Sequence, residues 1–151
     1  HEAGDGEWMM RYPDRSERSS FGEVGVHGSG DDLAILTFGN GVYLSRQAQK
    51  KLAAEKIGAR VVDLRWLSPL PVESILKAVA GCRRVLVVDE TRQSGGVAEA
   101  LMALLTENTK TPHARLTARD SFIATGPAYA ATMPSADDIV AAARRLTERA
   151  S

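Results

Sequence analysis

The sequence predicts an α/β protein in which helices cover both faces of a mostly parallel sheet. Short runs of β-branched and other apolar residues alternate with segments of helical periodicity, as in parallel strands joined by right-handed crossovers. One such run, Val85–Val88, is followed by the polar stretch Asp89–Arg92, which we expect to end the strand. Gly95 and Gly96 then open an apolar helix, Val97–Leu105. The predicted architecture is a three-layer α/β/α sandwich.

The first 32 residues are the least regular part of the chain. They hold eight acidic residues against three arginines and are rich in Gly, Ser and Asp, which is typical of a connecting segment. We interpret residues 1–22 as a linker from an upstream domain that is missing here, and residues 23–151 as one domain with a sizeable core. Glu23–His27 alternates well enough to predict a short edge strand.

The next unit is a strand, a turn and a helix. Leu33–Phe38 reads as a buried strand, and Gly39-Asn40-Gly41 as a tight turn. Val42–Ile57 has one apolar stripe and predicts a helix, for which Gly58 is a natural C-terminal cap.

A third strand, Ala59–Leu64, leads into a proline-containing turn. Pro69 and Pro71 block continuation of the strand and favour the start of a helix, whose apolar residues continue to Val79. Gly81 ends that helix.

The last part of the chain holds a weaker strand and a well-marked helix. The strand lies around Ala114–Ala118 and is followed by a long loop through Gly126-Pro127 to Met133-Pro134. Ser135, with two aspartates in the next turn, predicts an N-cap and a helix to the end of the chain.

Composition excludes several classes of function. Nineteen basic residues balance nineteen acidic ones without clustering, which argues against nucleic-acid binding and against an anionic membrane surface. No segment approaches the roughly 20 continuous apolar residues of a membrane span. The start of the chain does not resemble a signal peptide, so we expect a cytoplasmic protein. The single cysteine, Cys82, is expected to be a buried structural thiol.

The turn Gly39-Asn40-Gly41, with Asp63 at the end of the following strand, has the spacing of a dinucleotide-binding motif. The third glycine of that motif is replaced by Leu44, so we favour a plain turn and a strand-end acid. The backbone N–H groups of Asn40 to Val42 could still hold an anion. A regulatory nucleotide- or anion-binding domain therefore stays open.

Charged residues follow the strands at their carboxyl ends: Asp63, Arg65, Asp89, Glu90 and Arg92. Such a cluster fits an acid/base site or a salt-bridged docking rim. We favour the rim, because no histidine accompanies a nucleophile at catalytic spacing.

The order of strands should change between strand 33–38 and strand 85–88, which places a crevice there. Gly39, Asn40, Gly41, Glu90 and Arg92 are then the candidate residues for partner docking or small-anion binding. No catalytic, cofactor-binding or metal-binding residue is predicted.

Three motifs together resemble one family: Asp63-Leu64-Arg65-Trp66-Leu67-Ser68-Pro69-Leu70, Val88-Asp89-Glu90-Thr91-Arg92-Gln93-Ser94-Gly95-Gly96 and Met133-Pro134-Ser135-Ala136-Asp137-Asp138-Ile139-Val140. In order and spacing they are similar to the C-terminal domain of 2-oxoacid dehydrogenase E1 β subunits, within the transketolase C-terminal domain family. The resemblance covers roughly residues 24–150. It implies a five-stranded sheet whose N-terminal edge strand is antiparallel to the rest.

The resemblance also implies a role in a larger enzyme, an oxidoreductase that decarboxylates a 2-oxoacid and passes the acyl group to lipoamide. In that family, pyrimidine- and pyrophosphate-binding domains hold thiamine diphosphate and Mg²⁺. Neither domain is in this chain, so we expect it to bind no cofactor and to be inactive alone.

The implied partners are those two domains, a second β-type subunit in a homodimer, and the subunit-binding domain of the lipoyl acyltransferase (E2). The alternative parents are transketolase, deoxyxylulose phosphate synthase and pyruvate oxidoreductase, which share this domain.

Overall fold

The computed structural model describes residues 14, 16, 18–122 and 124–148, and its centre is a five-stranded sheet. The strands are β1 (Gly25–His27), β2 (Leu33–Thr37), β3 (Ala59–Asp63), β4 (Val85–Arg92) and β5 (His113–Ala118). Their order is β1-β3-β2-β4-β5, and only β1 is antiparallel to its neighbour. The central strand β2 is buried throughout, which explains its continuous apolar run.

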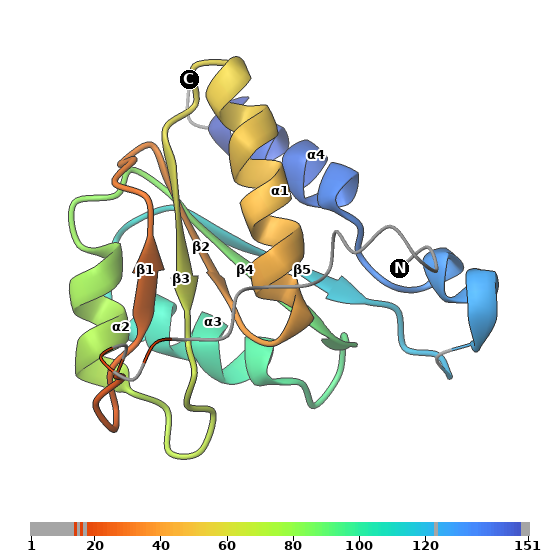
Figure 1. Cartoon of the computed structure of the whole chain (residues 1–151), viewed down its shortest axis with the longest axis horizontal. Coiled ribbons are helices and arrows are strands. Elements are labelled where there is room, and N and C mark those ends of the chain that lie inside the picture. The colour runs from red at the N-terminus through yellow and green to blue at the C-terminus, as the bar shows by residue number, and fades with distance from the viewer. Residues whose placement is uncertain (1–13, 15, 17, 123, 149–151) are drawn as a thin grey trace.

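Helices cover both faces of the sheet (Figure 1). They are α1 (Asn40–Ala54), α2 (Val72–Val79), α3 (Val97–Asn108) and α4 (Ala136–Glu148), with a 3₁₀ helix, η1 (Gly126–Ala131), before α4. α1 and α4 pack side by side on one face, and α2 and α3 lie on the other. The predicted three-layer sandwich, with an antiparallel N-terminal edge strand, is confirmed.

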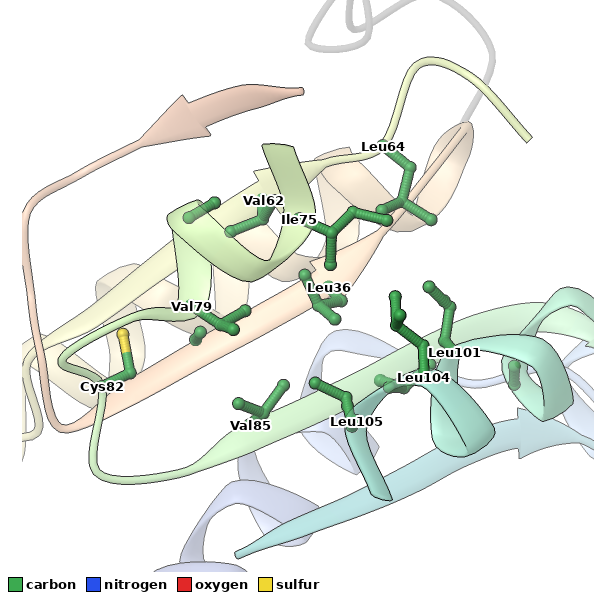
Figure 2. Packing of buried hydrophobic residues seen from close by; sticks show 14 residues of the cluster. Leu36, Val62, Leu64, Ile75, Val79, Cys82, Val85, Leu101, Leu104 and Leu105 are labelled. Carbon is green, nitrogen blue, oxygen red and sulfur yellow. The ribbon is translucent and has the colours of Figure 1, made fainter. Parts of the chain in front are cut away.

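Alternate residues of the strands pack into two separate hydrophobic cores, one on each face of the sheet. Leu36, Val62 and Val87 point to the face of α2 and α3, where Ile75 and Leu101 complete the packing shown in Figure 2. The residues between them in the strands point to the other face, against α1 and α4. Because both faces of β2, β3 and β4 are covered, these strands carry apolar residues at successive positions.

The prediction that Asp89–Arg92 ends the fourth strand is wrong. β4 continues to Arg92, and its pairing with β5 resumes at Arg92 and Ala118 after an irregularity between Asp89 and Arg92. Periodicity did not indicate this extension, because the polar stretch pairs with an edge strand where its side chains reach solvent. The buried carboxylate of Asp89 instead bonds backbone N–H groups of the following loop and helix.

The predicted linker, residues 1–22, lies mostly outside the described residues. Within its described part, the ring of Phe21 packs against Trp66, with 4.5 Å between ring centroids. Ser19 accepts a hydrogen bond from Arg65. The end of this segment therefore lies against the loop that follows β3, and the division into a linker and a domain stays a prediction.

Candidate functional site: the carboxyl edge of the sheet

The change in strand order lies between β2 and β4, where the sequence analysis places it. β2 is followed by α1 and then by β3 on one side, whereas β4 lies on the other side of β2, so the strand order changes between β2 and β4. Gly39 makes the turn with φ of 58°, a left-handed conformation that glycine adopts without strain. The candidate residues from both strand ends therefore meet at one edge.

Asn40 and Glu90 form the direct contact across this crevice. The Asn40 side-chain amide donates to Glu90 Oε1 at 2.6 Å, joining the start of α1 to the end of β4. In the same turn, the N–H of Gly41 donates to the Phe38 carbonyl and that of Val42 to the Gly39 carbonyl. A carboxylate thus already sits by the α1 N-terminus, where it interacts favourably with the helix dipole.

Gly41 allows α1 to begin close above β2. A Cβ atom on Gly41 would lie 2.2 Å from Thr37 Oγ1, which is shorter than any allowed contact distance. The second glycine of the turn is therefore required by packing at this position, and this close approach needs no bound ligand to explain it.

Asp89 is fully buried and organises the β4–α3 connection. Its two carboxylate oxygens accept from the N–H of Thr91 at 2.7 Å and from the N–H of Ala98 at 2.8 Å. The second bond satisfies a free N–H in the first turn of α3. A Cβ on Gly96 would lie 2.6 Å from Thr91 Oγ1, so glycine is needed there as well.

Arg92 pairs with Ala118 of β5 at the end of β4. Its charge helps to lower the pKa of Asp120, after the larger effect of hydrogen bonds from the Ser94 side chain and the Ser94 and Gln93 backbone. The structure brings together Gly39, Asn40, Gly41 and Glu90 at the start of α1. No contact links Arg92 to them among the hydrogen bonds and ion pairs of the described residues.

Asp63 and Arg65 form a second polar pair beside α1. Arg65 Nε lies 3.6 Å from Asp63 Oδ2, and the Arg65 backbone N–H also donates to Asp63. The guanidinium lies over Gly25 of β1, where an added Cβ would be 2.6 Å from Arg65 Nη2. These contacts fit the salt-bridged rim that the charge pattern favoured.

A pocket of about 570 Å³ lies between α1 and the edge strand β1. His27, Arg46, Lys50 and Arg65 contribute to its lining. Gly39, Asp63 and Arg65, which the sequence analysis had singled out, also line this pocket, but that analysis did not point to His27, Arg46 or Lys50. The signal that could have found it is the spacing of Arg46 and Lys50, which places both on one helix face.

An exposed arm connects β5 to α4. We use this name for residues 119–122 and 124–134, which extend beyond β5 in Figure 1. Phe122 is 98% exposed and Tyr129 is 49% exposed, and all of residues 124–131 are exposed. The bond from the Arg119 N–H to the Thr132 carbonyl joins the two ends of the arm.

The described residues hold no group of three or more His, Cys, Asp or Glu side chains placed to bind a metal ion. No helix among them has both the length and the apolar character needed to cross a membrane.

The comparisons with known proteins agree with this fold. The family model "Transketolase, C-terminal domain" matches residues 22–139, and the chain belongs to that family. The chain is 30% identical over 145 residues to the pyruvate dehydrogenase E1 component subunit beta of Bacillus subtilis, covering 93% of this chain and 45% of that protein. It is 34% identical over 87 residues to the 2-oxoisovalerate dehydrogenase subunit beta of B. subtilis, covering 58% of this chain and 27% of the relative.

A solved structure gives the same result. The structure described as a split gene transketolase, an inactive beta4 tetramer, has a TM-score of 0.80 and 26% identity, covering 92% of this chain and 46% of that one. The chain thus spans about half the length, 45%, of the first of these curated relatives.

Proposed function

We propose that this chain is the C-terminal assembly and docking domain of a thiamine diphosphate-dependent 2-oxoacid dehydrogenase E1 component. The parent enzyme, in the cytoplasm, would oxidatively decarboxylate a 2-oxoacid and transfer the acyl group to lipoamide. Its partners would be the two cofactor-bearing domains, a second β-type subunit and the subunit-binding domain of the lipoyl acyltransferase. Family membership and the similarity to two dehydrogenase β subunits support this proposal.

The exposed arm is the observation that carries the assembly role. Aromatic residues are enriched in protein interfaces, and Phe122 leaves almost its whole side chain in solvent. Two exposed aromatic residues on one arm make it a candidate surface for a neighbouring subunit. The crevice residues Gly39, Asn40, Gly41 and Glu90, with Arg92 on the β5 side, are proposed as a second contact region.

The described residues do not fit thiamine diphosphate. The crevice already holds the Glu90 carboxylate beside the α1 N-terminus, where a diphosphate would otherwise bind. Asp63 and Asp89 add two further carboxyl groups at the same edge, and no metal-binding cluster is found among the described residues. These features support the proposal that other domains of the parent bind the cofactor.

We expect the chain to associate through the arm, which size-exclusion chromatography with light scattering can measure. The wild-type chain should run as a dimer, or form a complex when the acyltransferase's subunit-binding domain is added. The double variant Phe122→Ser/Tyr129→Ser should lose this association with an unchanged melting temperature, because neither residue lies in a core.

The matched control is Leu67→Ser/Val72→Ser, which removes two exposed apolar side chains elsewhere. This control should leave association intact. The proposal would be contradicted if the wild-type chain were a monomer and formed no complex with the subunit-binding domain. If the control lost association and the arm variant kept it, the assignment of the interface to the arm would be contradicted.

Transketolase is the second candidate parent, because the split gene transketolase structure superimposes with a TM-score of 0.80. A transketolase domain would not bind the acyltransferase's subunit-binding domain. The same chromatography therefore separates the two parents: dimerisation without complex formation favours transketolase.

A further inference from the structure

Among the described residues, no helix packs closely against strand β1 at the edge of the sheet. On the α1 and α4 face, α1 packs against β2, β3 and β4, while α4 packs against β4 and β5. Strand β1 lies beyond α1 at the sheet edge. Val26 pairs with Val62, which faces α2 and α3, so its neighbours Gly25 and His27 face the α1 side. A groove therefore runs between the side of α1 and the open face of β1.

Side chains close this groove at both ends. At one end, the Arg65 guanidinium lies over Gly25 and is held by Asp63 and by Ser19 Oγ at 2.7 Å. At the other end, the Gln49 amide donates to the carbonyls of His27 and Ala59 at 2.9 and 2.8 Å. The groove holds a pocket of about 570 Å³, and Arg65 is part of its lining.

The wall of the pocket on α1 carries two cations that have no ion-pair partner among the described residues, although Asp63 also lines the pocket. Arg46 and Lys50 are exposed, are one helical turn apart and line the pocket. Neither forms an ion pair with any residue in the described part of the chain, whereas Lys51 pairs with Asp137 of α4 at 2.6 Å. Val42 and Tyr43 add apolar surface nearer the start of α1.

We propose that this pocket binds a small organic phosphate. Its phosphate would lie between Arg46, Lys50 and His27, and its organic part against Val42 and the ring of Tyr43. Arginine and lysine suit a phosphate because both donate several hydrogen bonds and carry a full charge. A volume of about 570 Å³ lies within the usual range for small-molecule sites.

The pKa of His27 depends on the charges inside the pocket. Burial lowers its pKa first, the nearby Arg46 lowers it further, Asp63 raises it and Arg65 lowers it. Lys50 and Tyr43 are the other titratable groups that line the pocket. A bound phosphate adds negative charge beside the imidazole and favours its protonated form. Binding should therefore raise the His27 pKa and strengthen as the pH falls through it.

The test is an NMR titration of the whole chain with phenyl phosphate, which combines a phosphate with an aromatic ring. We expect amide shifts concentrated at His27, Tyr43, Arg46 and Lys50, and a rise in the His27 pKa measured on its ring signals. Arg46→Gln/Lys50→Gln should weaken binding at least about tenfold, because it removes both unpaired cations. Inorganic phosphate should bind more weakly than phenyl phosphate, since it leaves the apolar wall empty.

The control is Lys51→Gln/Lys77→Gln, which removes the same charge from α1 and α2 outside the pocket. This control should bind phenyl phosphate as the wild type does. An equal loss of affinity in both double variants, or shifts spread over the surface with no change at His27, would overturn the proposal. The outcome does not depend on the assembly role, which the arm variant tests separately.

Discussion

At the scale of the residue, Asp89 shows how one buried carboxylate shapes the polar edge. It is fully buried, yet both of its oxygens accept backbone hydrogen bonds, from Thr91 and Ala98. Buried polar groups are tolerated when they are paired in this way. Among the charged strand-end residues, Asp89 is therefore structural, whereas Glu90 is partly exposed and Arg92 is exposed.

We expect Asp89→Ala to lower the free energy of unfolding by about 2–4 kcal/mol, because it leaves two N–H groups without acceptors. Asp89→Asn should cost less, since its side-chain oxygen can still accept one bond. Urea denaturation of the purified variants measures both effects. Glu107→Ala, an exposed carboxylate of α3, is the control and should be near neutral. Equal stability of Asp89→Ala and the wild type would show that this carboxylate does not hold the loop.

At the scale of the element, α4 begins with the capping arrangement that its sequence predicts. Ser135 Oγ accepts from the Asp138 N–H at 3.1 Å, and the Asp138 carboxylate accepts from the Ser135 N–H at 2.9 Å and from Ser135 Oγ. Helix α4 is also joined to α1 by ion pairs of Lys51 with Asp137 and of Arg144 with Glu55. The local cap thus starts the helix, and the contacts with α1 orient it.

Ser135→Ala should lower the free energy of unfolding by about 1 kcal/mol near neutral pH, as expected for the loss of an N-cap. Ser29→Ala, at an exposed loop position, should leave the stability unchanged. Denaturant unfolding measures the difference. A cost equal to that of the control would mean that the cap contributes nothing to the stability of α4.

The cap also gives a pH dependence. The pKa of Asp138 is lowered mainly by the hydrogen bond from the Ser135 side chain and then by that from its N–H. A carboxylate with a lowered pKa in the folded state stabilises the fold above its unfolded pKa of about 3.9. This stabilisation is lost as the pH falls through the lowered value.

The stability difference between the wild type and Asp138→Ala should therefore be constant near neutral pH and shrink below about pH 4. Urea denaturation at a series of pH values measures it. A difference that does not change with pH would show that the charge of Asp138 has no part in the cap.

At the scale of the whole molecule, the chain is a folded unit with two cores and a polar edge, but it spans only about half, 45%, of a matching dehydrogenase subunit. In the proposed function, the exposed arm is the contact surface for a neighbouring subunit, and cofactor chemistry belongs to other domains of the parent.

Isothermal titration calorimetry of the chain with thiamine diphosphate and Mg²⁺ should show no specific binding, because carboxylates occupy the crevice at the strand ends. Glu90→Gln, which removes the charge beside α1, should not create tight binding either, since no metal-binding cluster is present in the described residues. Tight, magnesium-dependent binding by the wild-type chain would contradict the assignment of the cofactor to other domains.

The sequence by itself determined the fold class, the order of the elements, the position of the strand-order change and the family. Hydrophobic periodicity and capping residues determine the fold class and the order of the elements, because both depend on neighbouring positions along the chain. The family follows from the resemblance of the three motifs. The resemblance added the antiparallel direction of β1, which periodicity does not encode.

Only the tertiary structure decided which polar residues meet. Asn40 and Glu90 are fifty positions apart and come together because their strands are neighbours in the sheet. Arg92 pairs with Ala118 of β5 beyond the irregularity in β4, and the pocket between α1 and β1 lies where α1 leaves the edge strand uncovered. Periodicity shows which face of an element is buried, whereas these contacts depend on strand register, strand order and helix placement, which only the folded chain defines.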